Sequence, residues 1–265
     1  MTTIATLGHI ARDVVAGSDP RPGGGVFWSA RALARLGADA TVHASCSAEH
    51  RTALVPPLEA FGLPVTWYES STTTEYSFHY EGDRRIMWQD AVGDSWKPAQ
   101  ALAAAADATW INVCALTRTD FPEGTLAALA SEGRQLLVDL QGLVRTPTIG
   151  PLHTDEHIGD VLHNIEVLKL NDEEAETLVG SAEPEKLRSL GVPEVILTLG
   201  SKGAWVVTPE LVEHVPAVPV EGDVDPTGAG DTYSVTYIVQ RAAGAEPVEA
   251  ARVAAATVSA FLSST

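Results

Sequence analysis

The chain has 265 residues, with 35 acidic against 17 basic side chains and a formal net charge of −18 at pH 7. This balance argues against a nucleic-acid partner, because neutralising phosphate groups requires clustered Lys and Arg side chains. A hydrophobic content of 45% excludes an intrinsically disordered chain, and the length allows a sizeable core without disulfides or a structural metal.

The two cysteines, Cys46 and Cys114, lack the spacing of a zinc site or a CxxC redox motif. Cys114 lies in an apolar run, which predicts a buried thiol. No basic segment with a cleavage site opens the sequence, and no apolar run approaches the ~18 residues that cross a bilayer. We therefore expect a reduced, cytoplasmic protein with no membrane partner.

The first part of the chain alternates between strand and helix patterns. In chain order the patterns predict a strand at 3–8, a helix at 29–36, a strand at 40–44, a helix at 54–61 and a strand at 65–68. The first helix is expected to stop at Gly37, because glycine is favoured just after a helix C-terminus.

The stretch 72–88 has a different period. Tyr76 and Phe78 share one parity and polar residues take the other, until a turn at 81–83. Such alternation is typical of an antiparallel hairpin with one wet face. We expect it to form a small β lid, at about 65–93, inserted in a single domain that spans 1–265.

From residue 99 onward, helices alternate with continuous apolar strands. The strands are expected at 108–114, 135–140, 167–170, 195–199 and 204–207, and alanine-rich helices at 228–242 and 248–262. Continuous apolar strands between helices indicate a parallel sheet covered on both faces. The predicted fold class is therefore α/β, with a three-layer, doubly wound, mostly parallel sheet.

A phosphate site is expected where a glycine-rich turn opens a helix, because free N–H groups and the helix dipole attract anions there. Gly23-Gly24-Gly25 precedes a helix but lacks the GxGxxG pattern, and no P-loop motif occurs. The strongest candidate is Asp225-Pro226-Thr227-Gly228-Ala229-Gly230-Asp231. Its small residues let backbone N–H groups approach a phosphoryl oxygen.

Asp231 follows these glycines in the first turn of the expected helix. A base beside an anion hole suits the transfer of a phosphoryl group to a hydroxyl. An acidic residue at a helix start also stabilises the helix dipole, which is the purely structural alternative.

This segment resembles the second signature of the PfkB/ribokinase family of carbohydrate kinases, D-[TP]-[TN]-G-A-G-D. Further pieces are similar to the family pattern and follow its order: Gly8 with Asp13, Gly23-Gly24 with Ala34-Arg35-Leu36-Gly37, Asn171 with Glu174, and Thr198-Leu199-Gly200-Ser201-Lys202-Gly203. Gly8-His9, Arg84-Arg85 and Asp139-Leu140-Gln141-Gly142 look most similar to a branch that includes myo-inositol kinases.

The resemblance implies a ribokinase-like fold and an ATP- and Mg²⁺-dependent kinase that acts on a small sugar, cyclitol or related polyol. It implies Asp231 as general base and Gly228, Ala229 and Gly230 as the anion hole. The implied ATP-site residues are Thr198, Gly200, Ser201, Gly203, Asn171, Glu174 and Thr227. Glu174 would reach Mg²⁺ through water, and Asp225 lies where the family often builds a monovalent-cation site, such as one for K⁺.

The acceptor is expected to contact Asp13, Gly24, Gly25, Trp28, Phe78, Arg85 and Gln141. Trp28 stands where the family usually carries Asn, and Gly25 where it carries a polar residue, which argues against a ribose-like set of contacts. A nucleoside kinase of the same family and a non-catalytic ligand-binding protein remain the alternatives. The oligomeric state is left open between monomer and homodimer.

Two of these segments also have a purely structural interpretation. Asn171 with Glu174 is also an ordinary helix capping box, and Gly200 to Gly203 also suits a hairpin turn. A metal cluster built from His153, His157 and His163 is disfavoured, because prolines make that region a wet loop.

Overall fold

The computed structural model describes residues 3–81, 84–222 and 224–263. Its main element is a nine-stranded sheet in the order β14-β13-β12-β11-β9-β8-β1-β4-β5. The strands are β1 (Thr3–His9), β4 (Ala40–Cys46), β5 (Val65–Glu69), β8 (Ala108–Cys114), β9 (Gln135–Asp139), β11 (Val167–Asn171), β12 (Glu194–Thr198), β13 (Ala204–Val207) and β14 (Val212–Val215). All neighbours pair parallel except β12–β13 and β13–β14, so the expected mostly parallel sheet is confirmed.

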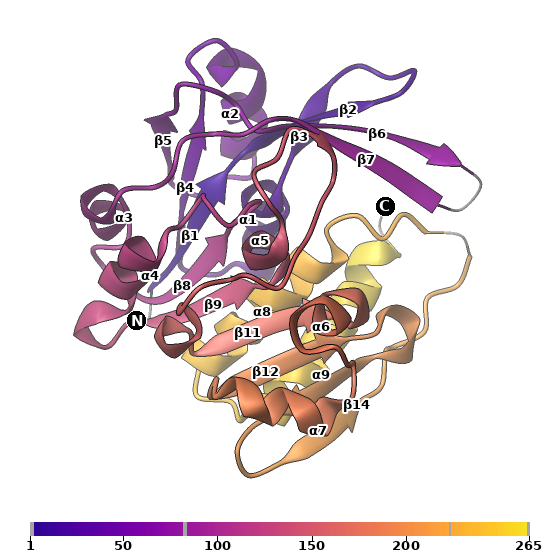
Figure 1. The fold of residues 1–265 in the computed structure, drawn as a ribbon. Coiled ribbons are helices and arrows are strands. Elements are labelled where there is room, and N and C mark those ends of the chain that lie inside the picture. The colour runs from indigo at the N-terminus through magenta and orange to yellow at the C-terminus, as the bar shows by residue number, and fades with distance from the viewer. Residues whose placement is uncertain (1–2, 82–83, 223, 264–265) are drawn as a thin grey trace.

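Helices cover both faces of this sheet (Figure 1). One face packs against α1 (Gly25–Leu36), α8 (Ala229–Ala242) and α9 (Pro247–Leu262), with α2 (Arg51–Glu59) beside α1. The other face carries α3 (Pro98–Ala104), α4 (Glu123–Ala130), α5 (Gln141–Val144), α6 (Asp172–Val179) and α7 (Pro184–Leu187). Successive residues of each inner strand enter opposite cores, which explains why these strands read as continuous apolar runs.

The limits of α1 show how local sequence sets an element. The helix ends at Gly37, whose φ of 62° is left-handed, and the Gly37 N–H donates to the Ala34 carbonyl oxygen. This agrees with the expected C-terminal signal. The helix starts four residues before the expected position, at Gly25, because Gly24 supplies the N-cap with a φ of 81°.

A second sheet of five strands stands at one edge of the large sheet and forms the lid (Figure 1). Its order is β10-β7-β6-β2-β3, from β2 (Ala11–Val15), β3 (Arg21–Gly23), β6 (Glu75–Glu81), β7 (Arg84–Ala91) and β10 (Gly150–Pro151). The expected hairpin is the antiparallel pair β6–β7.

The expected lid limits of 65–93 were wrong in two ways. β5 pairs with β4 in the large sheet, and β2, β3 and β10 join the lid from outside that range. The β2–β6 pair is parallel, so the lid is mixed and not purely antiparallel. The reason is geometric: β1 continues into β2 after one residue, Ile10, and β2 then finds its backbone partner in β6.

A buried ion pair at the opposite end of the sheet leads to a stability prediction. Glu194, 5% exposed, accepts from Tyr237 at 2.5 Å and from the Arg241 Nε at 3.0 Å. Arg241→Met leaves this carboxylate without its cation. We therefore expect the free energy of unfolding, measured by urea denaturation, to fall by about 3 kcal/mol. Arg252→Met is the matched control, because its pair with Glu213 is exposed and worth about 1 kcal/mol at most. Equal losses in both variants would contradict the prediction.

Candidate active site

Residues of the sequence motifs gather at the carboxyl edge of the parallel strands. This is the edge at which open α/β sheets bind ligands. The lid rises from the same edge, because β1 runs directly into β2 there (Figure 1). The last or nearly last residues of β1, β8, β9, β11 and β12 are Gly8, Cys114, Asp139, Asn171 and Thr198.

The glycine-rich segment forms the N-terminus of α8. Gly228 is the N-cap with a left-handed φ of 82°, and Asp231 lies in the first turn. The Ala229 N–H donates to the Pro226 carbonyl oxygen at 3.0 Å, which closes the turn before the helix. A Cβ on Gly228 would stand 2.7 Å from the Trp28 indole ring, so Trp28 packs directly on this turn.

Asp231 is half-buried and lies against the start of α1. Its Oδ1 is 2.9 Å from the position that a Cβ on Gly25 would take, and the Cys114 side chain borders the same position. Burial, and then the negative charge of Asp139, raise the pKa of Asp231 to about 7, although Lys169 acts in the opposite direction. A carboxyl group with this pKa is suited to accept a proton near neutral pH.

Lys169 is a residue of this edge that the sequence reading missed. Its ammonium group lies 2.7 Å from Asp139 Oδ2, and its side chain is 9% exposed. The Nζ atom is 3.0 Å from the position that a Cβ on Gly230 would occupy. The available signal was a single lysine inside the apolar run at 167–170.

The acceptor side joins β2 of the lid to α1. Asp13, 6% exposed, lies opposite Arg21 of β3 and Tyr76 of β6 in the backbone register of the lid sheet, and its carboxyl group lies against Gly23. Gly24 must be glycine, because its φ is 81° and a Cβ would stand 2.9 Å from the His9 carbonyl oxygen.

Gly23→Ala is expected to raise the KM for the acceptor about tenfold or more, because the new methyl group would occupy space 2.2 Å from Asp13 Oδ2. Losing a hydrogen bond to a charged group has an effect of this size. Steady-state kinetics with each substrate varied in turn checks it, and the KM for the donor should not change. Gly124→Ala is the control, since its new Cβ on α4 would have no atom within 4 Å among the described residues outside its own stretch of helix. An unaltered KM for the acceptor would count against Asp13 as an acceptor residue.

Of the other expected acceptor residues, Phe78 is buried on β6, 4% exposed. The Arg85 side chain lies outside the described residues. Gln141, at the start of α5, accepts a 2.8 Å hydrogen bond from Arg145, whose guanidinium group lies 5.9 Å from the Tyr76 ring centre. These last contacts connect the edge of the large sheet to the lid.

Asn171 and Glu174 form the capping box that the structural alternative described. The Asn171 side chain accepts from the Glu174 N–H at 2.8 Å, and Glu174 accepts from the Asn171 N–H at 2.9 Å. Burial and Asp139 raise the pKa of Glu174 to about 7, while Lys169 and Arg145 lower it. Asp139, Lys169 and Arg145 therefore influence both Glu174 and Asp231, which places the two carboxyl groups in one electrostatic neighbourhood.

The expected nucleotide loop joins β12 to its antiparallel partner β13. Gly200 and Gly203 both have left-handed φ, 55° and 96°, and the exposed Ser201 lies between them in a 3₁₀ turn. Thr198 donates to the Leu170 carbonyl oxygen at 3.1 Å.

The exposed loop before α8 is organised by its own aspartate. Asp225 Oδ1 accepts from the Thr227 N–H at 3.0 Å and from the Thr227 hydroxyl at 2.6 Å. This carboxylate therefore holds the turn that leads into the glycines.

In the part of the chain that the structure describes, no three His, Cys, Asp or Glu side chains form a group that could hold a metal ion. No helix in that part is long and apolar enough to cross a bilayer.

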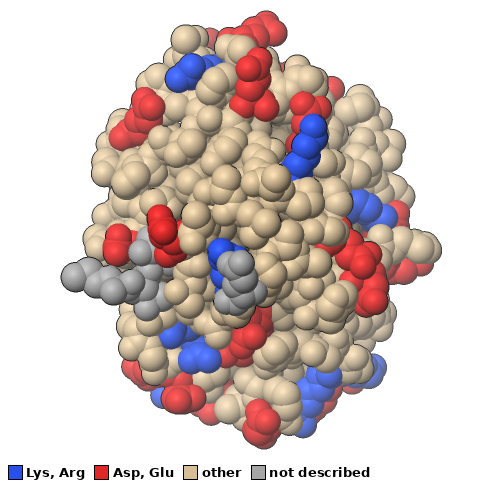
Figure 2. Space-filling model, turned by 90° about the vertical axis from the view of Figure 1, so that its left-hand side faces the viewer, with Lys and Arg blue, Asp and Glu red and all other residues tan. Residues whose placement is uncertain are grey.

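Acidic and basic side chains are scattered over the face in Figure 2 without a continuous basic area. Cys46 and Cys114 are both free and buried, as expected for Cys114.

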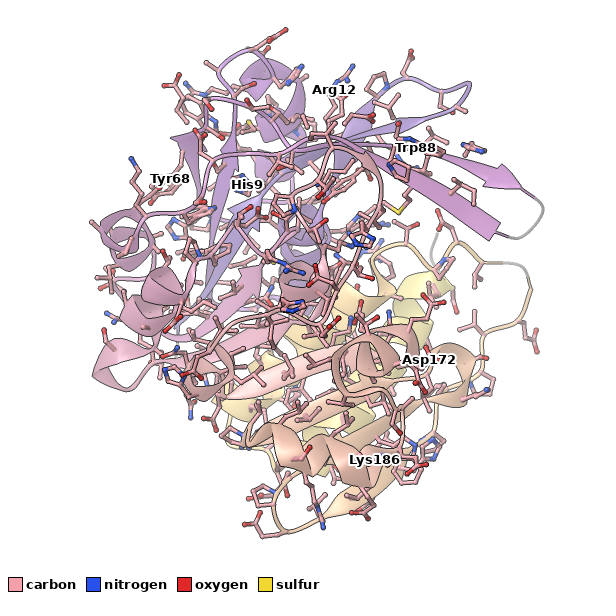
Figure 3. The ribbon with its side chains drawn as sticks, in the orientation of Figure 1. His9, Arg12, Tyr68, Trp88, Asp172 and Lys186 are labelled. Atoms are coloured by element: carbon pink, nitrogen blue, oxygen red, sulfur yellow. The ribbon has the colours of Figure 1, made fainter. Side chains whose placement is uncertain are left out.

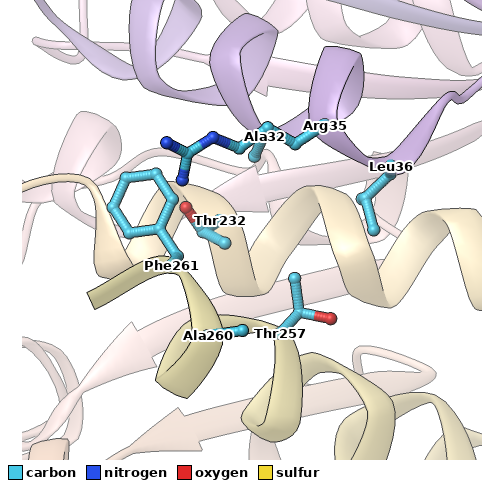
Figure 4. Close-up of a pocket in the computed structure, with 7 residues that line it drawn as sticks. All are labelled: Ala32, Arg35, Leu36, Thr232, Thr257, Ala260 and Phe261. Atoms are coloured by element: carbon cyan, nitrogen blue, oxygen red, sulfur yellow. The ribbon is translucent and has the colours of Figure 1, made fainter. Parts of the chain in front are cut away.

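A pocket of about 200 Å³ lies between α1, α8 and α9 (Figure 4). None of the residues expected in the site lines it. The lining residues are Ala32, Arg35, Leu36, Thr232, Thr257, Ala260 and Phe261.

Comparison with known proteins gives the same family as the motifs. The model of the pfkB family carbohydrate kinases matches residues 6–265. Ribokinase of Bacillus subtilis (strain 168) is 27% identical over 271 residues, covering 95% of this chain and 89% of the relative.

Solved structures share the fold. A pyrophosphate-dependent kinase in the ribokinase family, complexed with a pyrophosphate analog and myo-inositol, has a TM-score of 0.84 at 24% identity, covering 99% of this chain and 95% of the other. A nucleoside kinase of Burkholderia thailandensis in complex with inosine has a TM-score of 0.76 at 19% identity, covering 99% and 91%.

The family model covers nearly the whole chain, and the signature residues lie together at the ligand-binding edge of the sheet. The chain therefore belongs to the pfkB family of carbohydrate kinases.

Proposed function

We propose that this kinase phosphorylates a hydroxyl group of a cyclitol or a similarly small polyol or sugar, with Asp231 as the general base. The observation that carries the proposal is the position of Asp231, one residue after Gly230, in the first turn of α8 and against Gly25 at the carboxyl edge. This arrangement puts a proton acceptor next to backbone N–H groups that can bind an anion.

The chemistry follows from that position. Asp231 takes the proton of the acceptor hydroxyl as its oxygen bonds to phosphorus, and the bond from phosphorus to the donor's bridging oxygen breaks. Gly228, Ala229 and Gly230 are the proposed anion hole for the transferring group. Catalysis then depends mainly on positioning and on stabilising charge.

The cyclitol class is supported from two directions. The similar structure with a TM-score of 0.84 holds myo-inositol. In this chain Trp28 presents an indole ring where the family usually carries an amide, and a flat apolar face suits the C–H side of a ring polyol. Asp13, Gly24, Gly25, Phe78, Arg85 and Gln141 are the remaining proposed acceptor residues.

ATP is the proposed donor, with Thr198, Gly200, Ser201, Gly203, Asn171 and Thr227 on its side of the site. Glu174, whose pKa is raised beside Asp139, fits contact with a cation through water, because one of its oxygens is already held by the Asn171 N–H. Mg²⁺ bound there with the donor would neutralise phosphate charge. Asp225 is the proposed monovalent-cation residue, and we expect a cytoplasmic monomer or homodimer.

Pyrophosphate is the second candidate donor. It is favoured by the similarity to a pyrophosphate-dependent kinase. It is also favoured by the polar groups described around Asp231, which suit phosphate groups and not the adenine ring of ATP. Inosine in a further similar structure keeps nucleosides among the acceptors to be tested.

The test is an acceptor panel assayed with ATP and with pyrophosphate, each with Mg²⁺. The panel contains inositol stereoisomers, ribose, fructose and nucleosides, and phosphorus NMR detects the phosphorylated product. We expect the highest kcat/KM with an inositol. Transfer to nucleosides alone would replace the acceptor class, and ligand binding without transfer to any acceptor would favour a binding protein.

A further inference from the structure

Lys169 occupies an unusual place in the large sheet. It is the third residue of β11, paired in register with Asp139 of β9, and its neighbours Leu168 and Leu170 enter the core on one face. Val167 enters the core on the opposite face, beneath α8. Because strand residues alternate, Lys169 also points toward α8.

The side chain is almost entirely removed from water, at 9% exposure. Lysine is rarely buried to this extent unless it is paired, and Asp139 supplies the pair at 2.7 Å. Burial alone would lower the pKa of Lys169, but the attraction of Asp139 and of the other nearby carboxyl groups raises it, so the ammonium group keeps its charge.

Core packing alone does not account for the direction of this ammonium group. Its Nζ lies 3.0 Å from the position of a Cβ on Gly230, in the first turn of α8. The N-terminus of a helix carries partial positive charge and favours anions, so a cation there is unfavourable in the free protein. An anion bound at the start of α8 would be stabilised by both positive groups at once.

We propose that Lys169 is a catalytic residue that contacts the non-bridging oxygens of the transferring phosphoryl group at the N-terminus of α8. This inference rests on the proposed function. The acceptor oxygen bonds to phosphorus, the donor's bridging oxygen leaves with its electron pair, and the acceptor proton passes to Asp231. Lys169 stays protonated throughout and offsets the charge on the phosphoryl oxygens.

Asp139 has a positioning role in this scheme. Its carboxylate holds Nζ beside Gly230 from the neighbouring strand, where the parallel register fixes both backbones. Gly230 has no side chain, so the ammonium group can approach the N-terminus of α8. A methyl group on this residue would stand 3.0 Å from Nζ.

The first test compares Lys169→Met with Lys169→Arg. We expect Lys169→Met to lower kcat about 100-fold or more, the effect of removing one group that stabilises transition-state charge. Lys169→Arg keeps the charge and should retain more of the activity, and the KM for the acceptor should stay near that of the wild type. Lys186→Met is the control, because that lysine on α7 forms an exposed ion pair with Glu183, far from the lid (Figure 3).

The double variant Asp139→Asn/Lys169→Met distinguishes a catalytic role of Lys169 from a purely structural one. Removing both charges avoids an unpaired buried carboxylate, so its thermal unfolding midpoint should recover relative to Lys169→Met. Its kcat should not recover if Lys169 contacts the phosphoryl group. Recovery of kcat together with the midpoint would overturn the proposal.

Binding separates this inference from the proposed function, because it requires no turnover. Calorimetry with Mg²⁺-pyrophosphate and with Mg²⁺-ATP should show about tenfold or more weaker binding to Lys169→Met, as for the loss of a charged hydrogen bond. If wild type binds a donor but phosphorylates no acceptor, the function fails while weaker binding still supports Lys169. Wild-type affinity and kcat in Lys169→Met would overturn the role of Lys169 alone. Binding of neither donor to the wild type would overturn both.

Discussion

Asp231→Asn is expected to lower kcat by about 10²–10⁴-fold, the usual contribution of a general base. The amide has the size of the carboxyl group but does not accept a proton near neutral pH. The side chain contacts Gly25 and lies one residue after Gly230, so the variant should keep the geometry of the site. The KM values for donor and acceptor should therefore change little. Steady-state kinetics with the acceptor found in the panel is the measurement.

The control for Asp231→Asn is Asp172→Asn. Asp172 also lies in the first turn of a helix, α6, but it is exposed at the surface (Figure 3). If Asp231 only stabilised the helix dipole, both variants would lose about 0.3–1 kcal/mol of stability and neither would lose activity. Undiminished turnover in Asp231→Asn would remove it as the base.

The pH profile of kcat/KM is expected to fall on the acid side with a midpoint near pH 7, because the pKa of Asp231 is raised to about 7. The base must be ionised to take a proton, so activity is present above this pKa and is lost as the pH falls through it. Two pH units below the midpoint, at about pH 5, roughly 1% of the enzyme is ionised and kcat/KM should be about 100-fold below its plateau. Initial rates at low acceptor concentration across pH 4.5 to 9 would show this limb.

The cause of the shift is tested by Asp139→Asn. Asp139 raises the pKa of Asp231 and partly neutralises Lys169, which lowers it. Both effects of removing the Asp139 charge lower the pKa of Asp231. The acid limb should therefore move to lower pH. A wild-type midpoint near pH 4 would contradict the raised pKa, and an unmoved limb in Asp139→Asn would contradict its cause.

Much of the fold could be predicted because its signals are local. Gly37 ends α1 through a backbone conformation that glycine adopts without strain, and the alternation at 75–81 gives β6 regardless of its surroundings. The capping box of Asn171 and Glu174 is likewise formed within one turn of chain. The signature around Asp231 predicted the helix N-terminus and the kinase family for the same reason: its residues are consecutive.

Long-range pairing set the rest. The sequence contains no local sign that β2 leaves the large sheet for the lid or that β5 remains in it, because strand partners depend on where the chain returns.

The same holds for the site. Lys169 looked like a single polar residue in a buried strand, and only the register between β9 and β11 and the path of α8 bring its ammonium group to Asp139 and Gly230. Trp28 meets Gly228 only when α1 packs beside α8. The sequence by itself determined the family, the helix that holds Asp231 and most strands of the sheet. The tertiary structure decided which charges surround Asp231, because charges act through space and not along the chain.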